Sequence, residues 1–217
     1  MSAGIEISLA IILLSVLFSL SSSRLMTLIK LMALQGALVS LLPVLLNSAN
    51  KLPPGGIALF LIMLLIKAIL IPALLYFALT RMAIRREVEP LIGYHASVVV
   101  GLGLILLATY LSRYLQYSAP GVLALMPITA ITALGGGLFL MMSRTKALTQ
   151  VIGYLMLDNG IYLMGTALIK RTHSHYLVEL GVLLDLLVAV MIMGIILNNI
   201  NRAFDDVDTL DLEQLKD

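Results

Sequence analysis

Strongly polar residues stand near the centres of four long apolar segments. Gln35, Lys67, Asp158 and Asp185 each interrupt a run that could otherwise lie in lipid, and Asn159 follows Asp158 directly. A carboxylate at the middle of a membrane helix costs about 2.5–3.5 kcal/mol on insertion scales, so polar neighbours have to offset that cost. Ionisable groups that share a low-dielectric site titrate together, each responding to its neighbour's charge. A row of such groups at one depth therefore has the chemistry of a proton relay that runs laterally in the membrane.

A purely structural interpretation of the polar row stays open. One buried Asp and one buried Lys can pair and hold two helices together, and the row would then only fix helix register. Glu179, near the start of the last apolar run, is either a solvated rim residue or an exit from the relay. It precedes Asp185 by six residues, and about 240° of helical rotation puts the two acids on different faces. The candidate relay residues are Asp158, Asp185, Lys67, Glu179, Gln35 and Asn159.

The elements that must position these residues are membrane helices. The chain has 217 residues, of which 60% are hydrophobic and 12% charged, and its mean hydropathy is +1.05. Soluble domains are about half apolar and about one quarter charged, so we expect an all-α polytopic membrane protein. About 20 apolar residues cross a bilayer as a helix. Seven segments meet this length: 4–22, 25–46, 57–79, 95–112, 121–142, 147–169 and 177–200. Pro72 should kink the third, because its ring removes a helical hydrogen bond close to Lys67.

The polar residues also suggest an internal duplication. Placing Gln35 on Asp158 aligns 28–38 with 151–161, and placing Lys67 on Asp185 aligns the third segment with the seventh. Two three-helix repeats would share one orientation, because a single helix separates them. We expect a first repeat at 1–85, a connecting helix at 86–118, a second repeat at 119–202 and an acidic tail at 203–217. Residues 204–217 hold six of the twelve acidic residues.

Loop charges predict the orientation, because inside loops carry an excess of Lys and Arg. With the N-terminus outside, seven basic loop residues fall inside and four outside, so the tail would be cytoplasmic. The inside set is Arg24, Arg81, Arg85, Arg86, Arg144, Lys146 and Arg202, and the outside set is Lys51, Arg113, Lys170 and Arg171. The first apolar run has no basic segment before it, which favours a retained helix over a cleaved signal peptide.

Redox cofactors and catalytic sites are not expected in this chain. It has no cysteine, which excludes disulfides, iron–sulfur clusters and thiolate metal sites. His95 should lie across the membrane from His173 and His175, so a haem or metal held between them is not expected. No nucleophile–base pair or phosphate-binding loop appears, and an enzyme is the least favoured class.

Two motifs resemble a known family. "VIGYLMLDNGIYL" and "ELGVLLDLLVAVMIMGIIL", together with "IKAILIPALL" around Lys67, are similar to hydrogenase-4 component E. That subunit is related to the K subunit of respiratory complex I and to the C subunit of multisubunit Na⁺/H⁺ antiporters. The resemblance implies a non-catalytic, multi-pass subunit in a prokaryotic plasma (inner) membrane. Its implied partners are antiporter-like membrane subunits, the soluble [NiFe] and iron–sulfur subunits of the complex, and lipid; no nucleic acid is expected.

The resemblance also implies roles for individual residues. The K subunit carries two membrane carboxylates on its polar path, and the second matches Asp185. The first falls on Leu155, and the acid comes one turn later, at Asp158. Lys67 takes the place of Asp185 in the first repeat, and is either a base of the relay or a counter-ion. A self-sufficient secondary ion transporter built on the repeat is the alternative function; it should be stable and active without partners.

Overall fold

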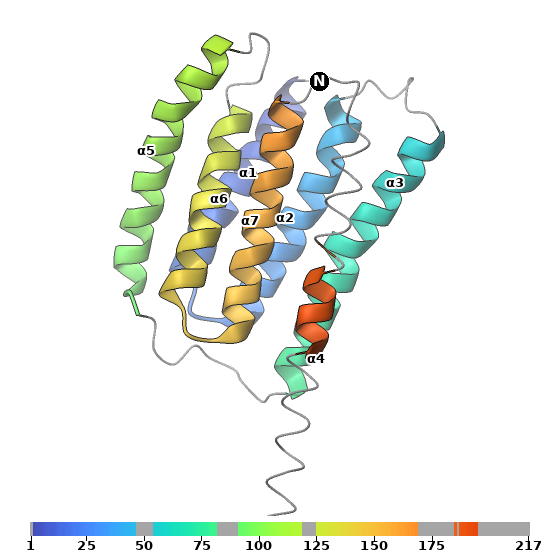
Figure 1. Cartoon of the computed structure of the whole chain (residues 1–217), viewed down its shortest axis with the longest axis vertical. Helices are drawn as coiled ribbons and strands as arrows, with labels where there is room; N and C mark the ends of the chain where they lie inside the picture. Colours follow the sequence, from blue (N-terminus) through green and yellow to red (C-terminus); the bar gives the residue numbers. More distant parts are fainter. Residues whose placement is uncertain are drawn as a thin grey trace, which may run out of the picture.

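The computed structural model describes residues 2–46, 54–81, 91–118, 125–168, 185 and 187–194. Within these residues the chain is helical apart from short turns (Figure 1), which confirms the all-α prediction. The elements are α1 (Ser2–Ser21), α2 (Leu25–Leu46), α3 (Pro54–Leu65), a π-helical turn η1 (Ile66–Leu70), α4 (Ile71–Arg81), α5 (Tyr94–Ser118), α6 (Leu125–Ser143) and α7 (Ala147–Leu168). Residues 187–194 are also helical.

Five stretches of the described residues are long and apolar enough to cross a membrane. They are Ala3–Ser21, Leu25–Leu46, Phe60–Thr80, Tyr94–Arg113 and Leu125–Ser143, and each coincides with a predicted segment. Helix α7 has the length of a span, at 22 residues, but Asp158 and Asn159 lower its hydropathy. The seventh predicted segment is described only at 185 and 187–194. The chain is therefore a polytopic membrane protein with an all-helical fold.

Two antiparallel helix pairs form the centre of the bundle, and the other helices pack against them. Helices α1 and α2 form one hairpin, and α6 and α7 form the other, as the short connections predict (Figure 1). The hairpins face each other, with α1 against α6 and α2 against α7. Helix α5 covers α1 and α6, while α3, η1 and α4 lie along α2. The predicted duplication of 1–85 and 119–202 remains a prediction, and the acidic tail at 203–217 lies outside the described residues.

Small residues let α6 and α7 approach closely. A Cβ added to Gly137 would lie 2.6 Å from both the carbonyl oxygen of Gly153 and the backbone nitrogen of Leu157. Small residues allow such backbone approach in membrane helix pairs, where van der Waals packing drives association. A glycine at 137 is therefore required for the close contact between α6 and α7.

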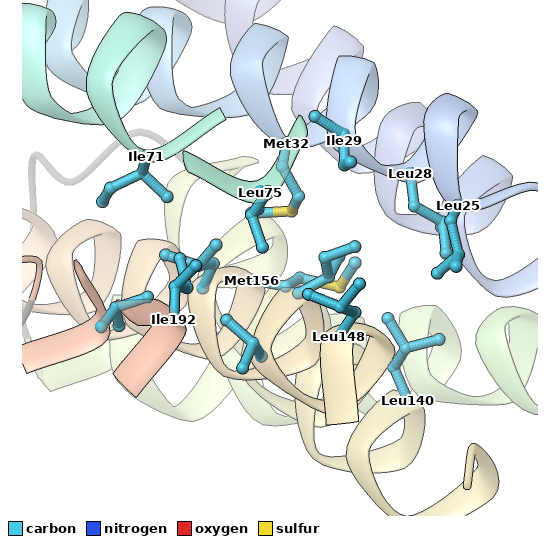
Figure 2. Close-up of a cluster of buried hydrophobic side chains, with 14 of the residues drawn as sticks. Leu25, Leu28, Ile29, Met32, Ile71, Leu75, Leu140, Leu148, Met156 and Ile192 are labelled. Atoms are coloured by element: carbon cyan, nitrogen blue, oxygen red, sulfur yellow. The ribbon is translucent and has the colours of Figure 1, made fainter. Parts of the chain in front are cut away.

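Apolar side chains from both hairpins and α4 fill the interior beside this seam. Figure 2 shows Leu28 and Met32 of α2, Leu75 of α4, Met156 of α7 and Ile192 in one buried cluster. Large apolar side chains also point outward from the bundle, including Leu106 at 72% and Met142 at 76% exposure. An apolar exterior around an interior with polar groups is the arrangement that lipid requires.

Arg144 was counted among the basic loop residues, but its side chain is buried. Its side chain is 1% exposed. The guanidinium donates to the Leu20 carbonyl at 3.0 Å and to the Ile92 carbonyl at 3.4 Å, and lies 4.5 Å from the Tyr94 ring centroid. Arg144 thus binds the end of α1 and the start of α5 to the α6–α7 turn.

Candidate functional site

Lys67 lies between two carboxylates in the interior of the bundle. Its Nζ forms an ion pair with Asp158 Oδ2, lies 3.0 Å from Asp185 Oδ1, and donates a hydrogen bond to Asn159 Oδ1 at 3.2 Å. The residues come from η1, from α7 and from the segment just before 187–194. Lys67 is 5% exposed, Asp158 1% and Asp185 0%. The structure therefore brings together four of the six predicted relay residues; we call Lys67, Asp158 and Asp185 the ion triad.

The ion triad contains one more carboxylate than ammonium groups. Asp158 Oδ1 and Asp185 Oδ2 accept no hydrogen bond from the described residues. Asp185 Oδ1 is close enough to Lys67 for an ion pair, but its geometry is not that of a hydrogen bond. A surplus buried charge is costly in a low-dielectric interior. One bound proton, or one other small cation, would neutralise the site.

The helix that carries Lys67 is irregular at that residue. The predicted kink before Pro72 appears as the π-helical turn η1, which ends two residues before the proline. The Ile71 N–H bonds the Ile66 carbonyl, five residues back. Such π turns occur inside α-helices, often at functional sites. Pro72 was a usable signal for the location of the irregularity, although it did not indicate its type.

Gln35 does not join the ion triad. Its Nε2 donates to Ser15 Oγ on α1 at 2.7 Å, and Ser15 Oγ in turn donates to the Ile12 carbonyl at 2.6 Å. Gln35 is buried, and its Oε1 has no partner among the described residues. Ser15 was not among the predicted residues. The sequence signal for it is the spacing of Ser8, Ser15 and Ser19 along the first apolar run, and all three are buried on α1.

The remaining predicted positions divide into three groups. Leu155 is buried in the apolar cluster that also contains Met156 and Ile192, one turn before Asp158 on α7. His95 is exposed, and so are Lys30 and Glu6, two charged residues that were not predicted to join the relay. Glu179, His173 and His175 lie outside the described residues. In the part of the chain that the structure describes, no group of three or more His, Asp or Glu side chains could hold a metal ion.

Comparison with known proteins places the chain in a family. It is 33% identical over 190 residues to the uncharacterized protein Rv0085 of Mycobacterium tuberculosis, across 87% of this chain and 85% of that protein. The chain belongs to the Rv0085 family. This Rv0085-family chain is also 27% identical over 153 residues to hydrogenase-4 component E of Escherichia coli K12, across 69% of this chain and 68% of the relative. Hydrogenase-4 component E of Shigella flexneri matches equally.

Comparisons with protein-family models and with solved structures found no further relative of the Rv0085-family chain. No protein-family model matches it, and no solved structure gives a significant match. The 27% identity supports the resemblance of the motifs as a distant homology to hydrogenase-4 component E.

Proposed function

We propose that this chain is a non-catalytic membrane subunit of a hydrogenase-like or complex-I-like redox complex, in which the ion triad forms part of a lateral path for protons or Na⁺. The observation that carries the proposal is Lys67 held between two buried carboxylates, Asp158 and Asp185. A pair of opposite charges would be enough to hold two helices together. The additional carboxylate gives the site a charge that can change when a proton arrives or leaves.

The geometry supports transfer within the membrane plane. Asp158 lies on α7 and Asp185 on the neighbouring segment, with the Lys67 ammonium in contact with both. When one carboxylate binds a proton, the ammonium balances the other. A change of charge beside either carboxylate shifts which of them holds the proton, because coupled buried groups titrate as one set. Conduction would need neighbouring subunits to supply and remove the proton.

The homology supports membership of a complex. The E. coli and S. flexneri relatives carry the name hydrogenase-4 component E, and we extend to this chain the role of a component of a hydrogenase complex. The orientation with the N-terminus outside is part of the same proposal and rests on loop charge.

Membership is tested by what purifies with the chain. Gentle detergent extraction from native membranes, followed by mass spectrometry, should recover [NiFe] hydrogenase or complex-I-like subunits. Recovery of the chain as a stable monomer or homo-oligomer that transports ions by itself would contradict the proposal and favour a secondary transporter.

The relay is tested by Asp185→Asn, which keeps the shape of the side chain and removes its ability to ionise. Proton-coupled turnover of the assembled complex should slow while assembly persists. Ser19→Ala is a matched control, because Ser19 is buried and donates to the Ser15 carbonyl of its own helix. Normal coupling in Asp185→Asn would count against the relay.

A further inference from the structure

The buried residues around Lys67 recur at every fourth position, an interval that drifts around the axis of a regular α-helix. Met63, Lys67, Ile71 and Leu75 are each 5% exposed or less, and each follows the last by four residues. In an α-helix four residues turn about 400°, so three such steps would leave Leu75 about 120° away from Met63 around the axis. A regular helix would therefore spread these four buried residues over about 120° of its circumference.

The π turn η1 removes this drift. A π turn accommodates one additional residue and so absorbs about 100° of rotation, which leaves about 20° between Met63 and Leu75. The outward residues agree with this face, since Leu61, Leu65 and Ile69 are all more than half exposed. Because of η1, Lys67 points inward together with the residues before and after it.

The π turn also changes the bonding of the Lys67 carbonyl. In an α-helix this oxygen would accept from the Ile71 N–H, but that N–H bonds Ile66 instead. The next donor in the π register would be residue 72, a proline, which has no N–H. The Lys67 carbonyl lies against Gly36 of α2: a Cβ added there would be 2.7 Å from the Lys67 oxygen and 2.9 Å from the Lys67 Cβ. A side chain at 36 would have to displace the backbone that carries Lys67.

We propose that Gly36 and η1 are positioning elements for Lys67, which together hold its ammonium between Asp158 and Asp185. Gly36 lets the Lys67 backbone approach α2, and η1 turns the side chain toward the carboxylates. The importance of this positioning for transport rests on the proposed function, whereas the positioning itself can be measured separately.

Cysteine cross-linking measures the position of residue 67 directly, because the chain has no cysteine of its own. The pair Lys67→Cys and Asp158→Cys, treated with a short bis-methanethiosulfonate reagent in native membranes, should cross-link in the otherwise unchanged chain. Adding Gly36→Ala should lower the yield severalfold. Gly101→Ala on α5 is the control: its added Cβ would lie 2.8 Å from a Leu17 methyl and 2.9 Å from a Leu20 methyl of α1, helices that carry neither cysteine, and the yield should not change. An unchanged yield in Gly36→Ala would overturn the role of Gly36.

A pair of length variants tests η1 and does not depend on Gly36. Deleting Ala68 lets the helix become regular while Lys67 stays on the inward face, so the cross-link should persist. Inserting one alanine after Ala68 adds about 100° of rotation between Lys67 and the helix that follows. The single π turn η1 cannot absorb this rotation as well, and the cross-link should be lost. Equal yields in the two variants would overturn the role of η1.

Turnover of the Gly36→Ala complex, without the cysteines, separates this proposal from the proposed function. Loss of both cross-linking and proton-coupled turnover supports both. If cross-linking falls and turnover stays normal, the positioning stands and the relay fails. If cross-linking stays normal, the positioning by Gly36 is wrong whatever the turnover.

Discussion

Two polar centres lie inside this bundle, and they differ in charge. Gln35 of α2 pairs with Ser15 of α1, so the first centre consists of an amide and a hydroxyl. The second centre is the ion triad, with Lys67 in contact with Asp158 and Asp185. The alignment that suggests a duplication places Gln35 on Asp158, so these two residues, one from each centre, would be corresponding positions of the two repeats. A neutral pair can fix how helices pack, whereas a site with a surplus carboxylate can also change its charge.

The largest effect on stability is expected from Lys67→Met. This change removes the cation shared by two buried carboxylates, and breaking a buried ion pair from one side costs about 3–5 kcal/mol. Thermal unfolding in detergent should show the loss, as should a lower yield of assembled protein. Lys30→Met, at an exposed lysine, is the control and should change little. Equal stability of the two variants would mean that Lys67 does not compensate the carboxylates.

A smaller effect is expected from Gln35→Glu, which gives the neutral centre a charge. No described residue donates to Gln35 Oε1, and a carboxylate there would lack a cation. A loss of about 2–3 kcal/mol is expected from the cost of an ionisable side chain at a membrane interior. The same unfolding measurement checks it. A variant as stable as the original would show that the first centre tolerates charge, and the contrast between the two centres would disappear.

The smallest effect on stability is expected from Gln35→Leu. It removes the hydrogen bond to Ser15 without burying a new polar group, and Ser15 keeps its bond to the Ile12 carbonyl. A loss of about 0.5–1.5 kcal/mol follows from the net value of one such bond. A loss as large as that of Lys67→Met would contradict a purely packing role for the amide.

Much of this arrangement could be predicted from sequence, because the length of an apolar run and the depth of a polar residue within it can be counted along the chain. They identified the five spans found among the described residues, and they predicted that Lys67, Asp158 and Asp185 lie near one level. The partner of each polar group depends on the rotation of each helix and on which helix lies beside it. For this reason Gln35 was expected with the charged residues but bonds Ser15.

Two further features show where sequence patterns were insufficient. Arg144 was counted as a loop charge, but it is buried. Its guanidinium donates hydrogen bonds to backbone carbonyls at the end of α1 and just before α5. Pro72 indicated where the helix becomes irregular. The π register of the turn agrees with burial at every fourth position, and that burial is known only from the packed structure. Both features depend on contacts between helices far apart in the sequence.

If the ion triad conducts protons and the Gln35 centre only packs, the two centres should differ in proton-coupled turnover, which is measured in Asp158→Asn and in Gln35→Leu. Both variants are measured in the assembled complex, with assembly checked first. Asp158→Asn leaves Lys67 paired with Asp185 and removes the surplus carboxylate, so turnover should fall by roughly a hundredfold or more, the scale on which a positioned proton-transfer group contributes. Gln35→Leu should retain most of its turnover. Normal turnover in Asp158→Asn, or an equal loss in both variants, would contradict the account.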